Sequence, residues 1–473
     1  MKAEINFICN NSEIEASVHP GLSLLDFLRK ELRLTGTKEG CREGDCGACT
    51  ILIGEYIGKD IIYHSVNSCL LPIGDVFGKH VVTIEGLNNN ELNAVQKSFV
   101  EEGASQCGFC TPGFIVSLTG YFLSNKKFNV NHAIESMDGN VCRCTGHFSI
   151  IKAAQSSTKF LSKISSGKNH LNDLMKVGII PEYFSSIKER LGELKQKTAL
   201  TQTDSTIKFI IAGGTDLFVQ KWEDILDGKV NLLSSNGISN LIKEENRKCI
   251  IGARASVTDL IESKIIRKYL PSLTEKLKLF GSLPIRNRAT IGGNIINASP
   301  IADITSILLA LNSTLYLKQK KTERTLPLKD LYKGYKKLDL KKDELIDRIS
   351  FPLPAENSYF SFEKVSKRTY LDIASVNSSV YLEVDKNQIT EIHLSAGGVA
   401  PIPLYLKYSS EFLLGKEISS ENIHEAVNIA LSEIAPISDV RGSKEYKALL
   451  LRQLIFAHFI TLFPEKVNIK EIA

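Results

Sequence analysis

The sequence predicts a multidomain α+β chain, and three observations support that prediction. A length of 473 residues is too great for one hydrophobic core and suggests three or four domains. The first 90 residues alternate as strands around one helix, whereas residues 90–165 carry helical signals. The second half mixes apolar strands and helices with two double-glycine turns.

Residues 1–88 predict a compact domain of strands and one helix. Residues 1–18 read as a β-hairpin with a two-asparagine turn. Ser23 and Asp26 form a capping-box pattern at the start of an apolar helix. A glycine-rich cysteine loop follows that helix, and we expect a strand over 81–87 to close the domain. This order of elements is what a β-grasp ferredoxin needs.

Four cysteines of this domain have the spacing of plant-type [2Fe–2S] ligands, with one thiolate arriving from further along the chain. They are Cys41, Cys46, Cys49 and Cys69. Gly44 and Gly47 allow the loop to curl tightly and to aim backbone N–H groups at the sulfides. The spacing therefore predicts a one-electron carrier.

The helical region, residues 89–165, carries a second set of four cysteines: Cys107, Cys110, Cys142 and Cys144. We expect helices over 91–102 and 147–161, and another that starts with Thr111 as N-cap. Four thiolates in two close pairs can also bind zinc, although a Cys-x-Cys pair is uncommon in structural zinc sites. Buried structural thiols are the remaining alternative for both cysteine sets.

Residues 166–177 lie in a polar stretch that we interpret as a linker. Beyond it, an apolar strand enters the first double-glycine turn within residues 208–219. A second glycine pair lies between β-branched residues within 285–303. Paired glycines allow successive N–H groups to converge on an anion, and this arrangement suits a pyrophosphate.

Composition and charge exclude several classes of function. A net charge of +5 is small for this length and does not indicate nucleic-acid binding. No apolar run approaches membrane-spanning length, and the acidic, alternating N-terminus does not resemble a signal peptide. Cysteines held as metal thiolates fit a reducing compartment, so we expect a cytoplasmic protein.

Three motifs, CREGDCGACT, QCGFCTPG and CRCTG, occur here in that order and resemble the xanthine oxidase family of molybdenum hydroxylases. The resemblance implies a β-grasp [2Fe–2S] domain (1–88), a helical-bundle [2Fe–2S] domain (89–165) and an α+β FAD-binding domain of the vanillyl-alcohol-oxidase-like (PCMH) type (178–355). A C-terminal α+β domain (356–473) follows. His147 departs from the family pattern, which usually has Tyr at this position.

The same resemblance implies the residues that contact FAD. AGGTDL looks like the loop that wraps the pyrophosphate, and IGGN looks like a second pyrophosphate loop. Phe280 matches the aromatic residue that packs on the flavin ring, although packing in the core is an equal alternative. The implied contact residues are Ala212, Gly213, Gly214, Thr215, Asp216, Leu217, Phe280, Thr290, Gly293, Asn294, Asn297, Asp303, Ile346 and Lys364.

The order of two iron–sulfur domains and FAD on one polypeptide is similar to the small subunit of two-subunit bacterial xanthine dehydrogenases. The molybdenum-binding portion of single-chain members would need many hundred further residues. The resemblance therefore implies a large molybdopterin-binding partner in an (αβ)2 heterotetramer. It implies an oxidoreductase of purine metabolism that oxidises hypoxanthine and xanthine to urate. Electrons would pass from the partner's molybdenum site through both clusters to FAD and NAD+.

Two alternative functions stay open. The chain can instead serve an aldehyde or N-heterocycle hydroxylase, because substrate is chosen in the partner subunit. It can also be a free-standing iron–sulfur flavoprotein that carries electrons without molybdenum. The sequence assigns no catalytic acid or base to this chain in any of these cases.

Overall fold

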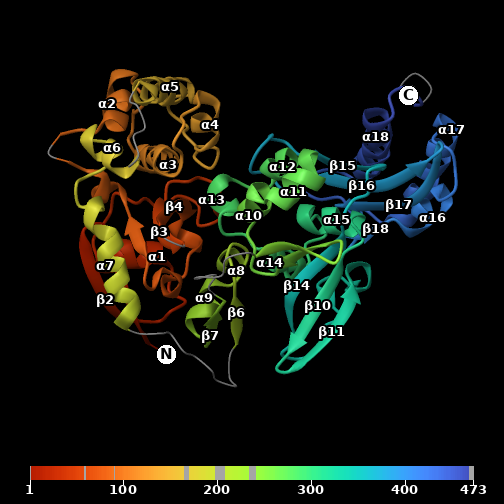
Figure 1. Cartoon of the computed structure of the whole chain (residues 1–473), viewed down its shortest axis with the longest axis horizontal. Helices are drawn as coiled ribbons and strands as arrows, with labels where there is room; N and C mark the ends of the chain where they lie inside the picture. The colour runs from red at the N-terminus through yellow and green to blue at the C-terminus, as the bar shows by residue number, and fades with distance from the viewer. Residues whose placement is uncertain are drawn as a thin grey trace. The chain divides into compact units, whose positions relative to one another are not determined.

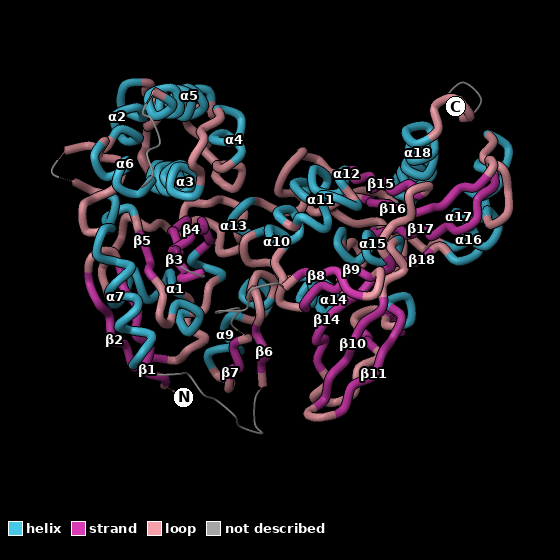
Figure 2. The backbone as a smooth tube through the Cα atoms, viewed as in Figure 1, coloured by secondary structure: helices cyan, strands magenta, loops and turns pink. Residues whose placement is uncertain are grey.

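The computed structural model describes residues 2–57, 60–89, 91–163, 170–197, 208–233 and 241–467 (Figures 1 and 2). The chain divides into two compact units, and each is described here by itself. Unit 1 comprises Met1–Ser239 with Ser282–Ala289, and unit 2 comprises Asn240–Gly281 with Thr290–Ala473. The multidomain α+β fold class predicted from the sequence is confirmed.

Unit 1 begins with a five-stranded sheet in the order β2-β1-β5-β3-β4, in which β1 and β5 are parallel and the other pairs antiparallel. Alternate residues on its core face, such as Ile5 and Phe7, are fully buried. They pack against the helical segment that begins at Leu24 and so stabilise the domain. The strands are β1 (Ala3–Cys9), β2 (Ser12–Val18), β3 (Thr50–Ile57), β4 (Asp60–Asn67) and β5 (His80–Val82).

The N-terminal hairpin and the capped helix are as predicted. The β1–β2 register closes at Cys9 and Ser12 around the asparagine turn. Ser23 caps α1 (Leu24–Asp26) by accepting a hydrogen bond from the Asp26 N–H, and a π-helical turn, Phe27–Glu31, continues it. The strand predicted over 81–87 is wrong beyond Val82, because Ile84–Leu87 forms a 3-10 turn.

A helical domain packs against this sheet. Its central helix α3 (Thr111–Ser124) is buried almost all round, and Gly120 lets it approach Leu52 of β3 closely. Thr111 is not the N-cap as predicted. Cys110 holds that position, and the Thr111 hydroxyl instead bonds Ser105. The other helices are α2 (Ala94–Glu101), α4 (Val130–Glu135) and α5 (Phe148–Ser162).

Part of the predicted linker is helical. Residues 166–169 lie outside the described residues, but α6 (His170–Lys176) occupies most of the remainder. Leu174 is buried with Ile179 and Phe184 in the core of the helical domain. The next helix, α7 (Phe184–Lys197), packs Ile187 and its neighbours on Ile8 of β1. The domain limits proposed from the sequence stay a prediction.

Two later segments complete unit 1. Residues 208–233 form the parallel pair β6 (Phe209–Ile211) and β7 (Val230–Leu232), joined through α8 (Leu217–Gln220) and α9 (Trp222–Leu226). Ser282–Ala289 contains α13 (Leu283–Arg286), and Arg286 forms a buried ion pair at 2.7 Å with Asp138 of the helical domain. Phe209 and Phe218 of the first segment pack with Cys49 and Cys69, and the Arg286–Asp138 pair attaches the second segment to the helical domain.

Unit 2 contains two antiparallel sheets. The first has the order β11-β10-β14-β9-β8 and the second β15-β16-β17-β18. Helix α15 (Asp303–Ala310) packs on β16 and β17 of the second sheet. The strands are β8 (Ile242–Glu245), β9 (Lys248–Gly252), β10 (Thr314–Gln319), β11 (Thr322–Pro327), β14 (Leu345–Pro352), β15 (Ser358–Val365), β16 (Val376–Asp385), β17 (Gln388–Gly397) and β18 (Leu404–Tyr405). The two-stranded ribbon is β12 (Tyr332–Gly334) with β13 (Lys337–Leu338).

Helices cover the second sheet and fill its core with aliphatic and aromatic side chains. The α+β character expected for the C-terminal region is confirmed by the strands β16 and β17 and the helices α17 and α18. No helix among the described residues is both long and apolar enough to cross a lipid bilayer. The remaining helices of unit 2 are α10 (Val257–Glu262), α11 (Lys264–Tyr269), α12 (Pro271–Lys276), α14 (Ile291–Asn297), α16 (Lys407–Leu413), α17 (Ser420–Glu433) and α18 (Lys444–Leu462).

A buried histidine makes the stability of unit 2 depend on pH. His458 of α18 is fully buried against the Ser361 hydroxyl, and burial lowers its pKa to about 3. Below pH 6.5 the unfolded chain binds a proton that the folded chain excludes, so stability falls as pH falls. We expect His458 to lower the free energy of unfolding by about 1.4 kcal/mol for each pH unit below 6.5.

Calorimetric unfolding between pH 7.5 and 5.5 measures this slope. We expect His458→Gln to flatten it, whereas His132→Gln, at an exposed histidine of α4, should leave it unchanged. Equal slopes in wild type and His458→Gln would contradict the assignment.

Candidate iron–sulfur and flavin sites

The four cysteines of the first set, which lie in the β-grasp domain, form two pairs of neighbouring thiols. Cys49 and Cys69 lie 3.4 Å apart and are buried, and Cys41 is hydrogen-bonded to Cys46. Cys49 and Cys69 belong to the apolar core that also contains Phe209 of β6. This half of the first site is therefore shielded from water.

Hydrogen bonds favour a thiolate in each pair. The bond from Cys46 lowers the pKa of the Cys41 thiol to about 5, and backbone N–H groups of the loop, including that of Glu43 at 3.3 Å, act in the same direction. The hydrogen bond between Cys49 and Cys69 likewise lowers the pKa of Cys49. Deprotonated sulfur is the form that binds iron.

The second set also forms two pairs, of which one is exposed. Cys107 and Cys144 lie 3.5 Å apart at the surface, and Cys110 is hydrogen-bonded to Cys142. Although burial alone would raise it, hydrogen bonds from the Thr145 hydroxyl and N–H lower the pKa of Cys142.

The loops that carry the two sets contact each other directly. The Val141 N–H donates to the Cys46 carbonyl at 3.0 Å, and the Asn140 amide donates to the Gly47 carbonyl at the same distance. Gly47 has φ +64, and a Cβ there would lie 2.3 Å from the Gly139 carbonyl oxygen. Only glycine fits this approach.

The paired thiols fit [2Fe–2S] clusters. Each such cluster takes four cysteine thiolates, two on each iron, and each domain supplies two pairs. Within the described residues, no group of three or more His, Cys, Asp or Glu side chains is arranged to hold a single metal ion. The pairing of the thiols is compatible with the ligand sets predicted from spacing, whose assignment stays a prediction.

The first glycine turn is held by an arginine of the same unit. Arg288 donates to the carbonyl oxygens of Ala212 and Gly213 and is ion-paired with buried Asp75. A Cβ on Gly213 would lie 2.1 Å from the Arg288 carbonyl oxygen, and Gly214 adopts φ +83 beside the Leu70 carbonyl. The turn therefore lies beside the residue that follows Cys69. Thr215, Asp216 and Leu217 continue from it, and Leu217 begins α8.

The second glycine pair is not a loop as predicted. It forms the first turn of α14, where the Thr290 hydroxyl accepts a hydrogen bond from the Gly293 N–H. A Cβ on Gly292 would lie 2.8 Å from both Cβ and the carbonyl oxygen of Ala253, so a glycine is required by packing. The Asn294 side chain accepts hydrogen bonds from Thr305.

Two further candidate residues of unit 2 are brought together. Lys364 donates to the Asp303 carboxylate at 2.7 Å and to the Leu279 carbonyl at 2.8 Å, next to half-buried Phe280. Asp303 also accepts from Asn377 at 2.7 Å. This network fixes the segment that carries Phe280.

The remaining two candidates lie apart from that network in the described contacts. The Asn297 side chain accepts a hydrogen bond from Lys336 at 3.1 Å, and half-buried Ile346 pairs with Leu317 in the β10–β14 ladder.

Sequence reasoning missed several supporting residues. Asn140 bridges the two cysteine loops, and its side chain also accepts from Ser117 at 2.7 Å. His147 adopts φ +69 and accepts the Cys142 N–H at 3.1 Å through Nε2, so it supports a predicted ligand. The one indication of this role in the sequence is that His147 stands where the family usually has tyrosine.

Four family models match the chain in succession. They are described as a 2Fe-2S iron-sulfur cluster binding domain (7–72), a [2Fe-2S] binding domain (83–155), an FAD binding domain in molybdopterin dehydrogenase (189–354) and a CO dehydrogenase flavoprotein C-terminal domain (361–462). Together they cover both iron–sulfur motifs and both glycine pairs.

This chain spans less than half the length of the curated relatives that it matches. Xanthine dehydrogenase of Emericella nidulans is 30% identical over 91% of the chain, which spans 36% of that protein. Human aldehyde oxidase is 27% identical over 97% of the chain, which spans 39% of that protein. Among solved structures, a carbon monoxide dehydrogenase from Hydrogenophaga pseudoflava is 29% identical over 53% of this chain and 88% of its own, with a TM-score of 0.50.

The geometry of the first glycine turn predicts that Gly213→Ala loses FAD. The added methyl group would meet the Arg288 carbonyl, and the turn would have to move away from it. We expect the ratio of flavin absorbance to protein to fall at least tenfold while both iron–sulfur EPR signals persist. Gly192→Ala is the matched control, because a Cβ there meets open space in α7. Full FAD occupancy in Gly213→Ala would contradict the role of this turn.

Proposed function

We propose that the chain belongs to the xanthine oxidase/CO dehydrogenase family and is the electron-transfer subunit of a molybdenum hydroxylase of the xanthine dehydrogenase type. Electrons from a molybdopterin site in a large partner subunit would pass through two [2Fe–2S] clusters to FAD and NAD+. We further propose an (αβ)2 heterotetramer in the cytoplasm.

One observation carries this proposal: unit 1 arranges the two thiol sets and the first glycine turn in a continuous series of contacts. The exposed Cys107–Cys144 end belongs to the helical domain, whose Val141 donates directly to Cys46. The buried Cys49–Cys69 end shares its core with β6, which enters the glycine turn. A series open to solvent at one end and closed at the other suits directional electron transfer.

The exposed end of this series supports a protein partner. Large apolar side chains adjoin the second cysteine set in the chain, and Phe109, Val141 and Phe148 are 45%, 42% and 68% exposed. Exposed apolar groups of this size next to redox ligands favour an interface over a free-standing carrier. Gln106, which matches a position near the pterin in the family, is exposed beside them.

The chemistry divides between the cofactors and the chain. When bound, the clusters carry single electrons, and FAD can combine two of them into a hydride for NAD+. The chain's own part is to hold eight thiolates, to keep Cys49 and Cys69 dry, and to place N–H groups on sulfur and on the pyrophosphate. We propose the predicted FAD contacts, including Phe280 and Ile346, as part of that binding.

The chain is similar both to xanthine dehydrogenases and to aldehyde oxidases, so aldehydes are a second candidate class of substrate. Turnover rates of the complex purified with its large partner, measured with hypoxanthine and with aldehydes, distinguish the two substrate classes. Purification without any large partner would favour the free-standing carrier. The electron acceptor is identified by measuring how much NADH and how much peroxide the complex forms in air. We expect NADH to be the main product.

Single cysteine variants test the two sites separately. We expect Cys46→Ser to abolish one [2Fe–2S] EPR signal and Cys110→Ser the other, because a serine oxygen holds iron less well than a thiolate. Cys249→Ser, at a buried core cysteine in β9, is the matched control and should retain both signals. Loss of both signals from either ligand variant would contradict independent sites.

A further inference from the structure

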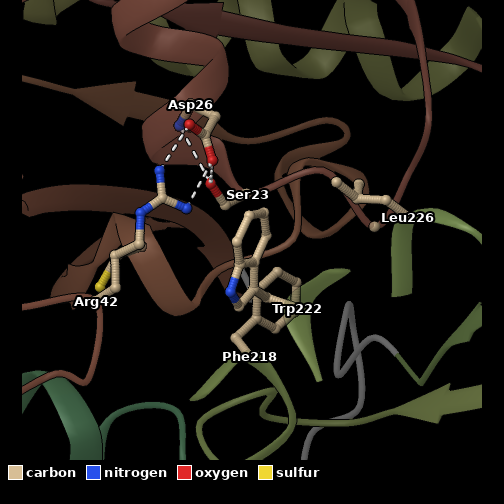
Figure 3. Close-up of a pocket in the computed structure, with 8 residues that line it drawn as sticks. Ser23, Asp26, Arg42, Phe218, Trp222 and Leu226 are labelled. Atoms are coloured by element: carbon tan, nitrogen blue, oxygen red, sulfur yellow. Dashed lines mark hydrogen bonds and ion pairs between the residues drawn. The ribbon is translucent and has the colours of Figure 1, made fainter. Parts of the chain in front are cut away.

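Arg42 lies inside the first cysteine loop and is clamped between an acidic helix end and the only tryptophan of the chain (Figure 3). We propose that this clamped guanidinium raises the redox potential of the plant-type cluster and makes Arg42 a positioning residue of the electron-transfer path. The inference rests on the proposed function, because it requires a cluster on Cys41, Cys46, Cys49 and Cys69.

The backbone at Arg42 adopts φ +57, a left-handed conformation that non-glycine residues rarely adopt. The turn leaves the Glu43 N–H facing the Cys41 sulfur at 3.3 Å. The side-chain contacts of Arg42 therefore have to hold this conformation.

Those contacts are strong and directional. Arg42 forms a two-pronged ion pair with Asp26, with N–O distances of 2.8 and 3.0 Å, and Nε donates to Glu39 at 2.6 Å. Asp26 is buried and also accepts from the Ser23 hydroxyl and from Lys30. Because Arg42 neutralises it, the pKa of Asp26 lies well below its usual range despite the opposing effect of burial. Both partners stay charged.

Trp222 closes the other side of the guanidinium. Its ring centroid lies 5.3 Å from Arg42 Cζ, within the range of a cation–π contact. Phe218 of α8 lines the same small pocket (Figure 3). Cys69 also lines it, so the pocket wall includes a predicted cluster ligand. Trp222 belongs to α9, in the segment that follows the first glycine turn. The cation thus lies where aromatic side chains limit its exposure to water.

Charge determines the sign of the effect. Reduction adds one negative charge to a cluster, so a fixed cation nearby favours the reduced form and a fixed anion opposes it. Arg42 and Lys30 balance Asp26 and Glu39. Removing Arg42 leaves a net negative group beside the loop, and removing Asp26 leaves a net positive one.

EPR-monitored redox titration of the cofactor-loaded chain tests this directly. Arg42→Asn removes the charge but keeps a residue that tolerates positive φ. We expect its plant-type signal to titrate at lower potential, with the equilibrium constant for reduction falling roughly tenfold, or about 59 mV for one electron. Asp26→Asn should shift the potential in the opposite direction. Glu39→Gln, at a more exposed partner, should do the same if Asp26→Asn does not fold.

Arg190→Gln is the matched control. Arg190 contacts Glu13 and Asn11 at the β1–β2 turn, so the same charge is removed away from the cysteine loop and no shift is expected. An unchanged potential in Arg42→Asn, or shifts of the same sign in Arg42→Asn and the acidic variants, would overturn the inference while leaving the proposed function intact. Absence of the plant-type signal from the wild type would overturn both.

Discussion

The direct contact between the two cysteine loops is the constraint on which the rest of unit 1 depends. Val141 and Asn140 donate to the carbonyls of Cys46 and Gly47, and the approach leaves no room for a Cβ at Gly47. A helical domain that packs this closely on a β-grasp sheet cannot be an independent module. Gly113 and Gly120 of α3 likewise leave no room for a Cβ, against the Gly47 carbonyl and against Leu52, so three glycines allow the helical domain to approach this closely.

Burial around the thiols follows from this packing. The Cys49–Cys69 pair lies in an apolar core that includes Phe209 and Phe218 from the segment around the first glycine turn. Low polarity there strengthens every charge interaction, and this is why paired charges such as Arg42–Asp26 occur beside the loop. The Cys107–Cys144 pair is exposed instead, so the protein leaves one end of the series available to a partner.

The sequence predicted most elements whose signals are local, including the β1–β2 hairpin, the Ser23 cap, α2 and α5. It predicted the two thiol sets, because spacing within a short motif restricts geometry. It could not predict which thiols pair. Nor did it predict α6, whose buried Leu174 depends on contacts with residues further along the chain. Gly292 and Gly293 predict a loop, yet they lie in the first turn of α14 because Thr290 caps that helix. Gly292 is required by its close packing on Ala253, a contact between residues distant in sequence.

We propose that one chain holds two separate iron–sulfur clusters and one flavin. Quantitative analysis of iron, acid-labile sulfide and FAD in the purified protein measures this stoichiometry. We expect about four irons, four sulfides and one FAD per chain. Half that iron content at full FAD occupancy, or zinc in place of iron, would contradict it.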